Sequence, residues 1–198
     1  MTVSISKMSG KLQGIAAINT NTVTNEYCNK QYSRADPDNI CTHCYSQNML
    51  KTFRKNCQPS FERNSNVLAS DKALDIPKIS RNNNLIRFNG HGELINAAHF
   101  LNLCEIAAAY PTKTFALWTK RYDLVKPLLD KTPANMILVY SNPRIDKVMD
   151  TPPKGFDKVF NNVSKEFDGE ANCTGQKCID CQVCYNFDTT NVIIEHVK

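Results

Sequence analysis

The chain has 198 residues, which is enough for one domain with a full hydrophobic core and too few for two comfortable ones. Its apolar content of 41% and charged content of 22% are ordinary for a globular protein, and no apolar run approaches the ~20 residues that span a bilayer. We therefore expect no membrane partner. The net charge of +5 is mildly basic, which is compatible with a polyanionic partner without requiring one.

The first residues, Met1 to Lys7, contain no apolar h-region and predict no secretory signal. The expected compartment is therefore a reducing cytosol. In that compartment, closely spaced cysteines more often bind metal or perform redox chemistry than form a disulfide framework.

The first half of the chain is predicted to be strand, loop and helices in that order. Residues 13–20 read as a short buried strand, and the polar, turn-rich residues 21–41 as a loop. A helical pattern runs from Cys44 to about residue 56, and Pro59 begins a second helix that continues to about residue 70.

The second half alternates between strands and helices. A helix is predicted over 93–109, with Leu94, Ala97, Ala98, Leu101 and Cys104 on its apolar face, and a short one over 122–129. The predicted strands are 85–89, 113–119, 136–141, 156–160 and 191–197.

This alternation predicts βαβ units, and therefore a parallel sheet with right-handed crossovers. The chain is well below the ~250 residues of a complete eight-fold barrel. We expect one α/β domain over residues 1–198, either a partial (β/α) barrel or an open, mostly parallel sheet. A cysteine-rich, cluster-binding segment, about 168–198, is expected to pack on it.

Seven of the nine cysteines form two groups with metal-ligand spacing. The first is Cys28, Cys41 and Cys44, and the second is Cys173, Cys178, Cys181 and Cys184. A Cys-x-x-Cys turn lets two thiolates converge on one metal or cluster. The compact run of the second group is close to ferredoxin spacing, whereas structural zinc typically uses two separated knuckles.

The identity of the metal stays open at this point. The first group has three cysteines, and an incomplete shell leaves a position for chemistry. Zinc in both groups is the alternative, with His43 as a fourth ligand of the first. Cys104 lies on an apolar helix face and is expected in the core, whereas Cys57 could be either a ligand or a packed residue.

Polar residues follow three consecutive predicted strands. Gly90, Gly92 and Glu93 follow the first, Lys120 follows the second, and Ser141 and Asn142 follow the third. Ligands of α/β sheets lie at the carboxyl ends of the strands, so these residues predict a lined pocket there.

A cysteine triad near the N-terminus, a strand followed by Gly-x-Gly-Glu, and later strands ending in Thr-Lys and Ser resemble the radical S-adenosylmethionine superfamily. The closest resemblance is to compact phage members related to the spore photoproduct lyase-like branch. The stretches 41–45 and 48–54 and the C-terminal Cys-x4-Cys-x2-Cys-x2-Cys also resemble a phage family named by a gene-product number. That resemblance would place the chain in the cytoplasm of a host cell.

The resemblance implies a role for each matching residue. Cys28, Cys41 and Cys44 would hold a [4Fe–4S] cluster that binds S-adenosylmethionine. Gly90, Gly92 and Glu93 would receive the methionine amino group, and His43 would pack against the adenine. Ser141 and Asn142 would lie near the ribose or the carboxylate. The implied activity is generation of a 5′-deoxyadenosyl radical that modifies an unknown substrate, for which nucleic acid is one candidate.

The sequence departs from the family pattern at the first cysteine. The common triad is Cys-x3-Cys-x2-Cys, whereas twelve residues separate Cys28 from Cys41 here. A longer loop can still deliver the ligand, because the cost of loop closure rises slowly with length. Two rival readings stay open. One is an electron-transfer protein without catalysis. The other is a zinc protein that binds a host protein or nucleic acid, with Lys51, Arg54 and Lys55 as phosphate contacts.

Overall fold

The computed structural model describes residues 2–197, so the two terminal residues of the predicted domain lie outside it. Its centre is a sheet of seven strands whose spatial order follows the chain order. The first strand pairs antiparallel with the second, and all later neighbours are parallel. The strands are β1 Ser6–Lys7, β2 Ala16–Ile18, β3 Leu85–Phe88, β4 Thr114–Thr119, β5 Met136–Ile145, β6 Lys158–Val163 and β7 Val192–His196.

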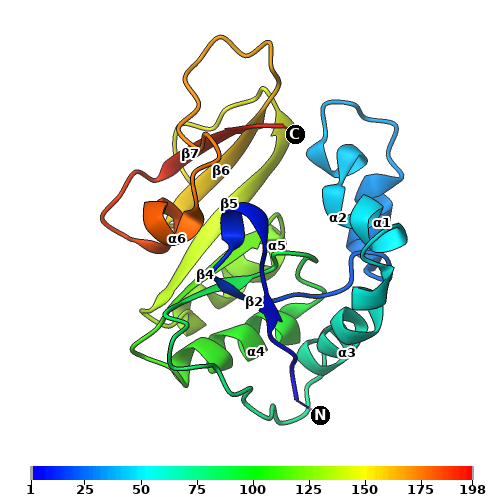
Figure 1. Cartoon of the computed structure of the whole chain (residues 1–198), viewed down its shortest axis with the longest axis vertical. Helices are drawn as coiled ribbons and strands as arrows, with labels where there is room; N and C mark the ends of the chain where they lie inside the picture. Colours follow the sequence, from blue (N-terminus) through cyan, green and yellow to red (C-terminus); the bar gives the residue numbers. More distant parts are fainter. Residues whose placement is uncertain (1, 198) are drawn as a thin grey trace.

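The sheet is open rather than closed into a barrel, which confirms the predicted α/β class with a mostly parallel sheet. Figure 1 shows α1, α2 and α3 as a continuous run along one side of the molecule, with α6 on the opposite side of the view. The helices are α1 Glu26–Tyr32, α2 Tyr45–Lys51, α3 Gln58–Leu68, α4 Ala97–Ala108, α5 Tyr122–Val125 and α6 Cys178–Cys181. Short 3-10 turns are η1 Gly10–Leu12, η2 Ile40–His43, η3 Lys55–Cys57, η4 Lys126–Lys131 and η5 Val183–Tyr185.

The two faces of the sheet are covered by different material. Alternate residues of a strand point to opposite faces. Phe88 and Phe115, which stack with ring centroids 5.1 Å apart, belong to the core shared with α3 and α4. On the other face Trp118 and Val139 pack against Tyr185 and the cysteine-rich segment. That segment therefore takes the place of a helical layer.

Three local predictions are corrected by the structure. Residues 21–41 are not all loop, because α1 forms within them. The predicted helix from residue 93 begins only at Ala97, where the side chain of Asn96 accepts from the backbone N–H of His99 at 2.9 Å. The predicted apolar face of this helix is right at Leu94 and Cys104, which are buried, but wrong at Leu101, which is 38% exposed. Phe100 and Leu103, which lie outside the predicted face, are buried instead.

Among residues 2–197, no helix is both long and apolar enough to cross a bilayer. All nine cysteines are free thiols. Cys104 is buried in the core against the first sheet face, which confirms its predicted packing role.

Candidate cofactor and metal site

Cys28 lies in the first turn of α1, a short helix that is fixed by one capping residue. Asn25 precedes the helix, and its side-chain oxygen accepts from the backbone N–H of Cys28 at 3.1 Å. Asparagine is a favoured N-cap because it satisfies an otherwise unpaired N–H. The amide nitrogen of Asn25 also donates to the carbonyl of Glu93 at 3.0 Å. One buried side chain therefore connects Cys28 to the predicted acidic residue.

Cys41 and Cys44 are held over the carboxyl end of β5. The side chain of Asn39 accepts from the N–H of Cys41 at 3.0 Å, and the N–H of Cys44 donates to the carbonyl of Cys41 at 3.2 Å. The loop is anchored because the N–H of Ile145 donates to the carbonyl of Asp38 at 2.8 Å. Cys44 directly precedes α2, so the Cys-x-x-Cys turn is fixed at both ends.

The turn after β3 requires glycine at Gly92. Its φ is +99°, and a Cβ there would stand 1.9 Å from the hydroxyl of Thr20. At Gly90 a Cβ would stand 2.7 Å from the side-chain oxygen of Asn19. A residue with a side chain at either position would collide with the residues that follow β2, so only glycine allows the backbone to come this close.

The carboxylate of Glu93 does not cap α4 but forms hydrogen bonds with residues at the end of the next strand, β4. It is buried, and it accepts from the N–H of Leu94 at 2.8 Å, from the hydroxyl of Thr119, and from the N–H of Lys120 at 2.9 Å. The ammonium of Lys120 in turn donates to the hydroxyl of Ser141 at 2.8 Å. These contacts join the ends of β3, β4 and β5, as the strand-end rule predicts.

Lys120 is a partly buried cation that interacts electrostatically with the first cysteine group. Burial lowers the pKa of Lys120, but its electrostatic interactions with Cys41, Glu93, Cys44 and Cys28 outweigh burial and raise that pKa above its usual value. The ammonium therefore stays charged beside the three thiols. Glu93 and the three cysteines of the first group thus all influence one cation.

Two thiols of this group, those of Cys28 and Cys41, have a raised pKa. Burial, followed by the nearby Glu93 and Cys44, raises the pKa of Cys28, and burial also raises the pKa of Cys41 although Lys120 acts in the opposite direction. Metal binding deprotonates a coordinating thiol outright, and its positive charge compensates for the buried thiolates. The donor chemistry of Cys28, Cys41 and Cys44 therefore fits a metal centre.

Ser141, Asn142 and His43 are placed differently from one another. Ser141 faces Lys120, whereas the amide of Asn142 binds the side chain of Asn161 at 2.9 Å and stays within the β5–β6 region. His43 is exposed, with its Nε2 3.2 Å from the carbonyl oxygen of Pro37. The suggested roles of Asn142 and His43 toward a ligand remain predictions.

The second cysteine group gathers on the other sheet face. Cys173, Cys178, Cys181 and Cys184 all line one small cavity of about 60 Å³, together with Tyr185. Burial raises the pKa of Cys184 to about 12 and also raises that of Cys178, while Arg87 opposes both shifts.

Two cations border this cavity. The ammonium of Lys11 lies 3.7 Å from the sulfur of Cys173 and pairs with Glu195. The guanidinium of Arg87 stands 3.8 Å from the ring centroid of Trp118, on the same face. The second group therefore has four thiols, an apolar floor and positive charge at its edge.

Within residues 2–197, no three His, Cys, Asp or Glu side chains stand together at the spacing of ligands to one metal ion. A single zinc ion with ~2.3 Å bonds to sulfur would need thiolates less than about 4 Å apart. A cubane spreads its ligands further, because each thiolate binds a different iron atom.

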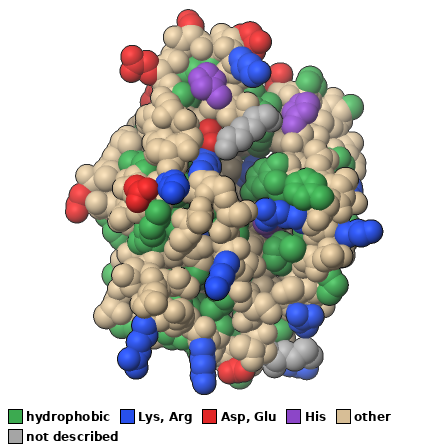
Figure 2. Space-filling view, in the orientation of Figure 1, with side chains coloured by type: hydrophobic (Ala, Val, Ile, Leu, Met, Phe, Trp, Pro, Cys, Tyr) green, Lys and Arg blue, Asp and Glu red, His purple; other side chains and the backbone are tan. Residues whose placement is uncertain are grey.

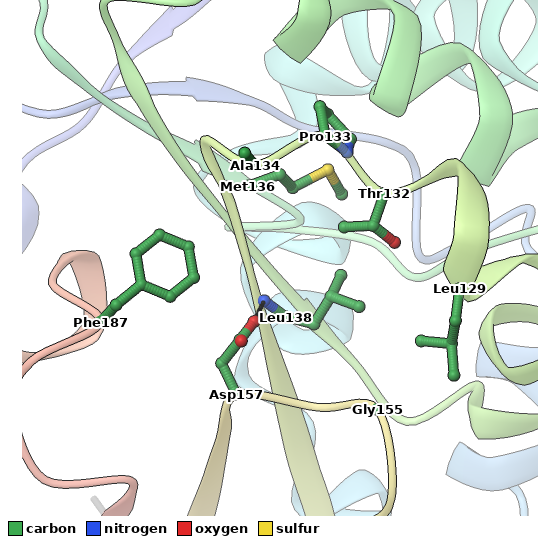
Figure 3. A pocket seen from close by; sticks show the side chains of 9 residues that line it. All are labelled: Leu129, Thr132, Pro133, Ala134, Met136, Leu138, Gly155, Asp157 and Phe187. Atoms are coloured by element: carbon green, nitrogen blue, oxygen red, sulfur yellow. Dashed lines mark hydrogen bonds between the residues drawn. The ribbon is translucent and has the colours of Figure 1, made fainter.

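A larger cavity of about 330 Å³ lies at the opposite end of β5 (Figure 3). Leu129, Met136 and Leu138 form one side of it, and Phe187 faces them from the other. Its carboxylate, from Asp157, is already engaged by the N–H of Leu138 at 2.7 Å. The cavity has no thiol or cation in its lining, so its chemistry does not match the strand-end site.

The model of one protein family, Gene product 88, matches residues 7–175. The chain belongs to the Gene product 88 family, which is a family of phage proteins. The match spans the first cysteine group, Glu93, Lys120 and Ser141, as well as Cys173. No curated protein and no solved structure matches this Gene product 88 chain.

The sequence of this Gene product 88 protein predicts Lys120 as a strand-end residue, whereas its interaction with the first cysteine group follows from the tertiary fold. Sequence reasoning misses Tyr27, for which adjacency to Cys28 is the one available signal. Arg121 lies 4.8 Å from the Tyr27 ring centroid, and burial and Glu93 raise the pKa of Tyr27.

Proposed function

We propose that the chain is an iron–sulfur enzyme of the radical S-adenosylmethionine type. In this proposal Cys28, Cys41 and Cys44 hold a [4Fe–4S] cluster, and Glu93 and Lys120 bind S-adenosylmethionine. The observation that carries it is the hydrogen-bond network at the carboxyl ends of β3, β4 and β5, which joins Glu93 to Lys120 and Lys120 to Ser141, and links Glu93 through Asn25 to Cys28.

The charges of this site are complementary to an α-amino acid. An ionised carboxylate offers about four acceptor positions, and three donors already orient that of Glu93. The remaining position suits an ammonium group. Lys120 has three donors and uses one on Ser141, so two remain for a ligand carboxylate. S-adenosylmethionine carries both groups on one carbon atom.

Three thiolates leave one iron of a cubane without a protein ligand, which is where a substrate or cofactor can bind. When bound and reduced, such a cluster supplies one electron that cleaves the sulfonium of S-adenosylmethionine, giving methionine and the 5′-deoxyadenosyl radical. The protein's own task is to position the two partners and exclude water. Glu93, Thr119 and Ser141 are buried and suited to that task.

The second group, Cys173, Cys178, Cys181 and Cys184, is proposed to hold a second cluster. Four thiolates complete a shell without leaving an open position. Its place on the apolar sheet face supports a role in electron relay or in stabilising the fold, rather than in binding substrate.

Anaerobic purification after reconstitution with iron and sulfide tests the proposal. We expect a brown protein with about eight irons per chain. Mixing the reduced protein with S-adenosylmethionine should then release 5′-deoxyadenosine. A colourless protein with stoichiometric zinc would overturn the proposal in favour of a non-enzymatic zinc protein that binds nucleic acid or a host protein.

Glu93→Gln tests the amino acid site directly. The substitution keeps the size of the side chain but removes the charge that faces the ligand ammonium. We expect S-adenosylmethionine to bind at least about 30-fold more weakly, because losing one partner of a buried charge pair costs about 2 kcal/mol or more. Glu105→Gln, exposed on α4, is the matched control. Unchanged binding in Glu93→Gln with normal iron content would show that the ligand lies elsewhere.

A further inference from the structure

Two highly exposed aromatic side chains follow the first cysteine group along the chain. Tyr45 follows Cys44 directly and is 55% exposed, and Phe53 lies just beyond α2 and is 73% exposed. Figure 2 shows hydrophobic side chains gathered on the α1–α2 side of this face, next to Lys or Arg side chains and at the rim of a hollow. A contiguous group of apolar side chains left in water commonly marks a binding surface.

The Tyr45 ring is fixed in place although it is exposed. Its hydroxyl donates to the carbonyl of Gly90, in the turn that precedes Glu93. Its ring meets that of His91 edge-on with centroids 5.6 Å apart, and the ring of Phe61 also packs against His91, with centroids 5.5 Å apart. A rigid, exposed ring therefore stands directly beside the proposed cofactor pocket.

The charged side chains of the segment that carries these rings have one sign. Lys51, Arg54 and Lys55 lie between or beside them, and no acidic residue occurs in the 23 residues from Asn39 to Phe61. Lys51 and Lys55 are exposed. The guanidinium of Arg54 is held by the hydroxyl of Ser9 at 3.0 Å, and no acidic side chain is among its hydrogen-bond partners in the described structure.

We infer that this surface, made of Tyr45, Lys51, Phe53, Arg54 and Lys55, binds single-stranded nucleic acid. Bases stack on exposed aromatic rings while Lys and Arg neutralise the phosphates, and this combination tolerates any sequence. A duplex hides the faces of its bases, so it can use only the cations. A base stacked on Tyr45 would lie next to the Gly90 turn, which makes nucleic acid the substrate class of the proposed enzyme.

The inference rests on the proposed function only where it names a substrate. Binding itself can be measured on the full chain without any chemistry. Failure of the radical activity would therefore leave a positive binding result intact, and the reverse also holds.

The test is fluorescence anisotropy with a labelled oligothymidylate of about 12 nucleotides, within the size range that single-strand binding folds cover. An oligouridylate of the same length distinguishes DNA from RNA, and a duplex serves as comparison. We expect the single strands to bind more tightly than the duplex. Phe53→Ala should weaken single-strand binding at least about fivefold, the effect of losing one stacked base.

Phe187→Ala is the matched control, because Phe187 is also exposed, at 48%, but lines the distant cavity of Figure 3. Lys55→Gln should lower the slope of log affinity against log salt by about 0.7. Equal binding of duplex and single strand, equal effects of the two Phe variants, or no binding of any oligonucleotide would each overturn the inference. The last outcome would assign the surface to a protein partner.

Discussion

The two cysteine groups of this molecule sit in contrasting surroundings. The first, with three thiols, lies at the carboxyl ends of the strands among the charges of Glu93 and Lys120. The second, with four thiols, lies on an apolar sheet face beside Trp118 and Tyr185. Under the proposed function, the incomplete thiol set in the polar pocket would leave a position for a ligand, whereas the complete set on the apolar face would leave none.

Paired cysteine variants provide the largest expected contrast between the groups. Cys41→Ser with Cys44→Ser, and Cys178→Ser with Cys181→Ser, should each lower the iron content from about eight to about four per chain. Only the first pair should abolish S-adenosylmethionine binding. Only the second should markedly lower the midpoint of thermal unfolding, because its segment covers one face of the sheet. Iron analysis and thermal denaturation of the same samples measure both effects.

If either pair removes all of the iron, the groups form one site and the contrast is wrong. If both pairs leave the iron at about eight, the ligands lie elsewhere in the chain. The wild-type protein and the Cys104→Ala variant serve as controls, because Cys104 belongs to the hydrophobic core.

Acid should destabilise the part of the fold around the first cysteine group, because the buried His91 lies there. Burial, reinforced by Arg54 and Arg87, lowers the pKa of His91 to about 4, from 6.5 in the unfolded chain. As the pH falls below about 6.5, the unfolded chain takes up a proton that the folded chain rejects, so stability decreases until about pH 4. Between pH 7 and pH 5 the loss from His91 is about 2 kcal/mol.

His91→Gln removes this titration and keeps a side chain that can pair with the hydroxyl of Ser46. Urea unfolding at pH 7 and pH 5 should therefore show a smaller loss of stability in His91→Gln than in the parent. His99, whose pKa burial lowers to about 3, contributes a loss of the same sign in both proteins, so it cancels in the comparison. An unchanged pH dependence would mean that His91 is accessible to protons in the folded state.

The strands and the strand-end site could be predicted from the sequence, because both depend on local patterns. β3, β4 and β5 are apolar runs, and the carboxyl ends of parallel strands meet at one edge whatever the details of packing. Cys28, Cys41, Cys44 and Glu93 followed from that rule and from cysteine spacing. Their position relative to Lys120 could not be predicted, because it depends on how residues 29–40, which include the end of α1 and the start of η2, fold back onto β5.

Two helices show why the rest could not be predicted. α1 buries only Gln31 and is fixed by the cap at Asn25, so it lacks the apolar periodicity that reveals a helix. In α4 apolar residues occur on most sides, so the sequence offers two apolar faces, one with Phe100 and Leu103 and another with Leu101. Only packing against the sheet determines which of these two faces is buried.

The smallest effect is expected from a substitution that removes a charge beside the second cysteine group and leaves the charges beside the first unchanged. Lys11 contacts the sulfur of Cys173 at 3.7 Å in the second group, whereas Lys120 serves the first. Lys11→Met keeps the length of the side chain but removes the charge beside a thiolate, so the second group should lose metal to a chelator about tenfold more readily. Lys7→Met, exposed on β1, is the control. If Lys11→Met also releases metal from the first group, the two groups share one electrostatic environment. If Lys11→Met retains metal as well as the control does, Lys11 acts only through Glu195.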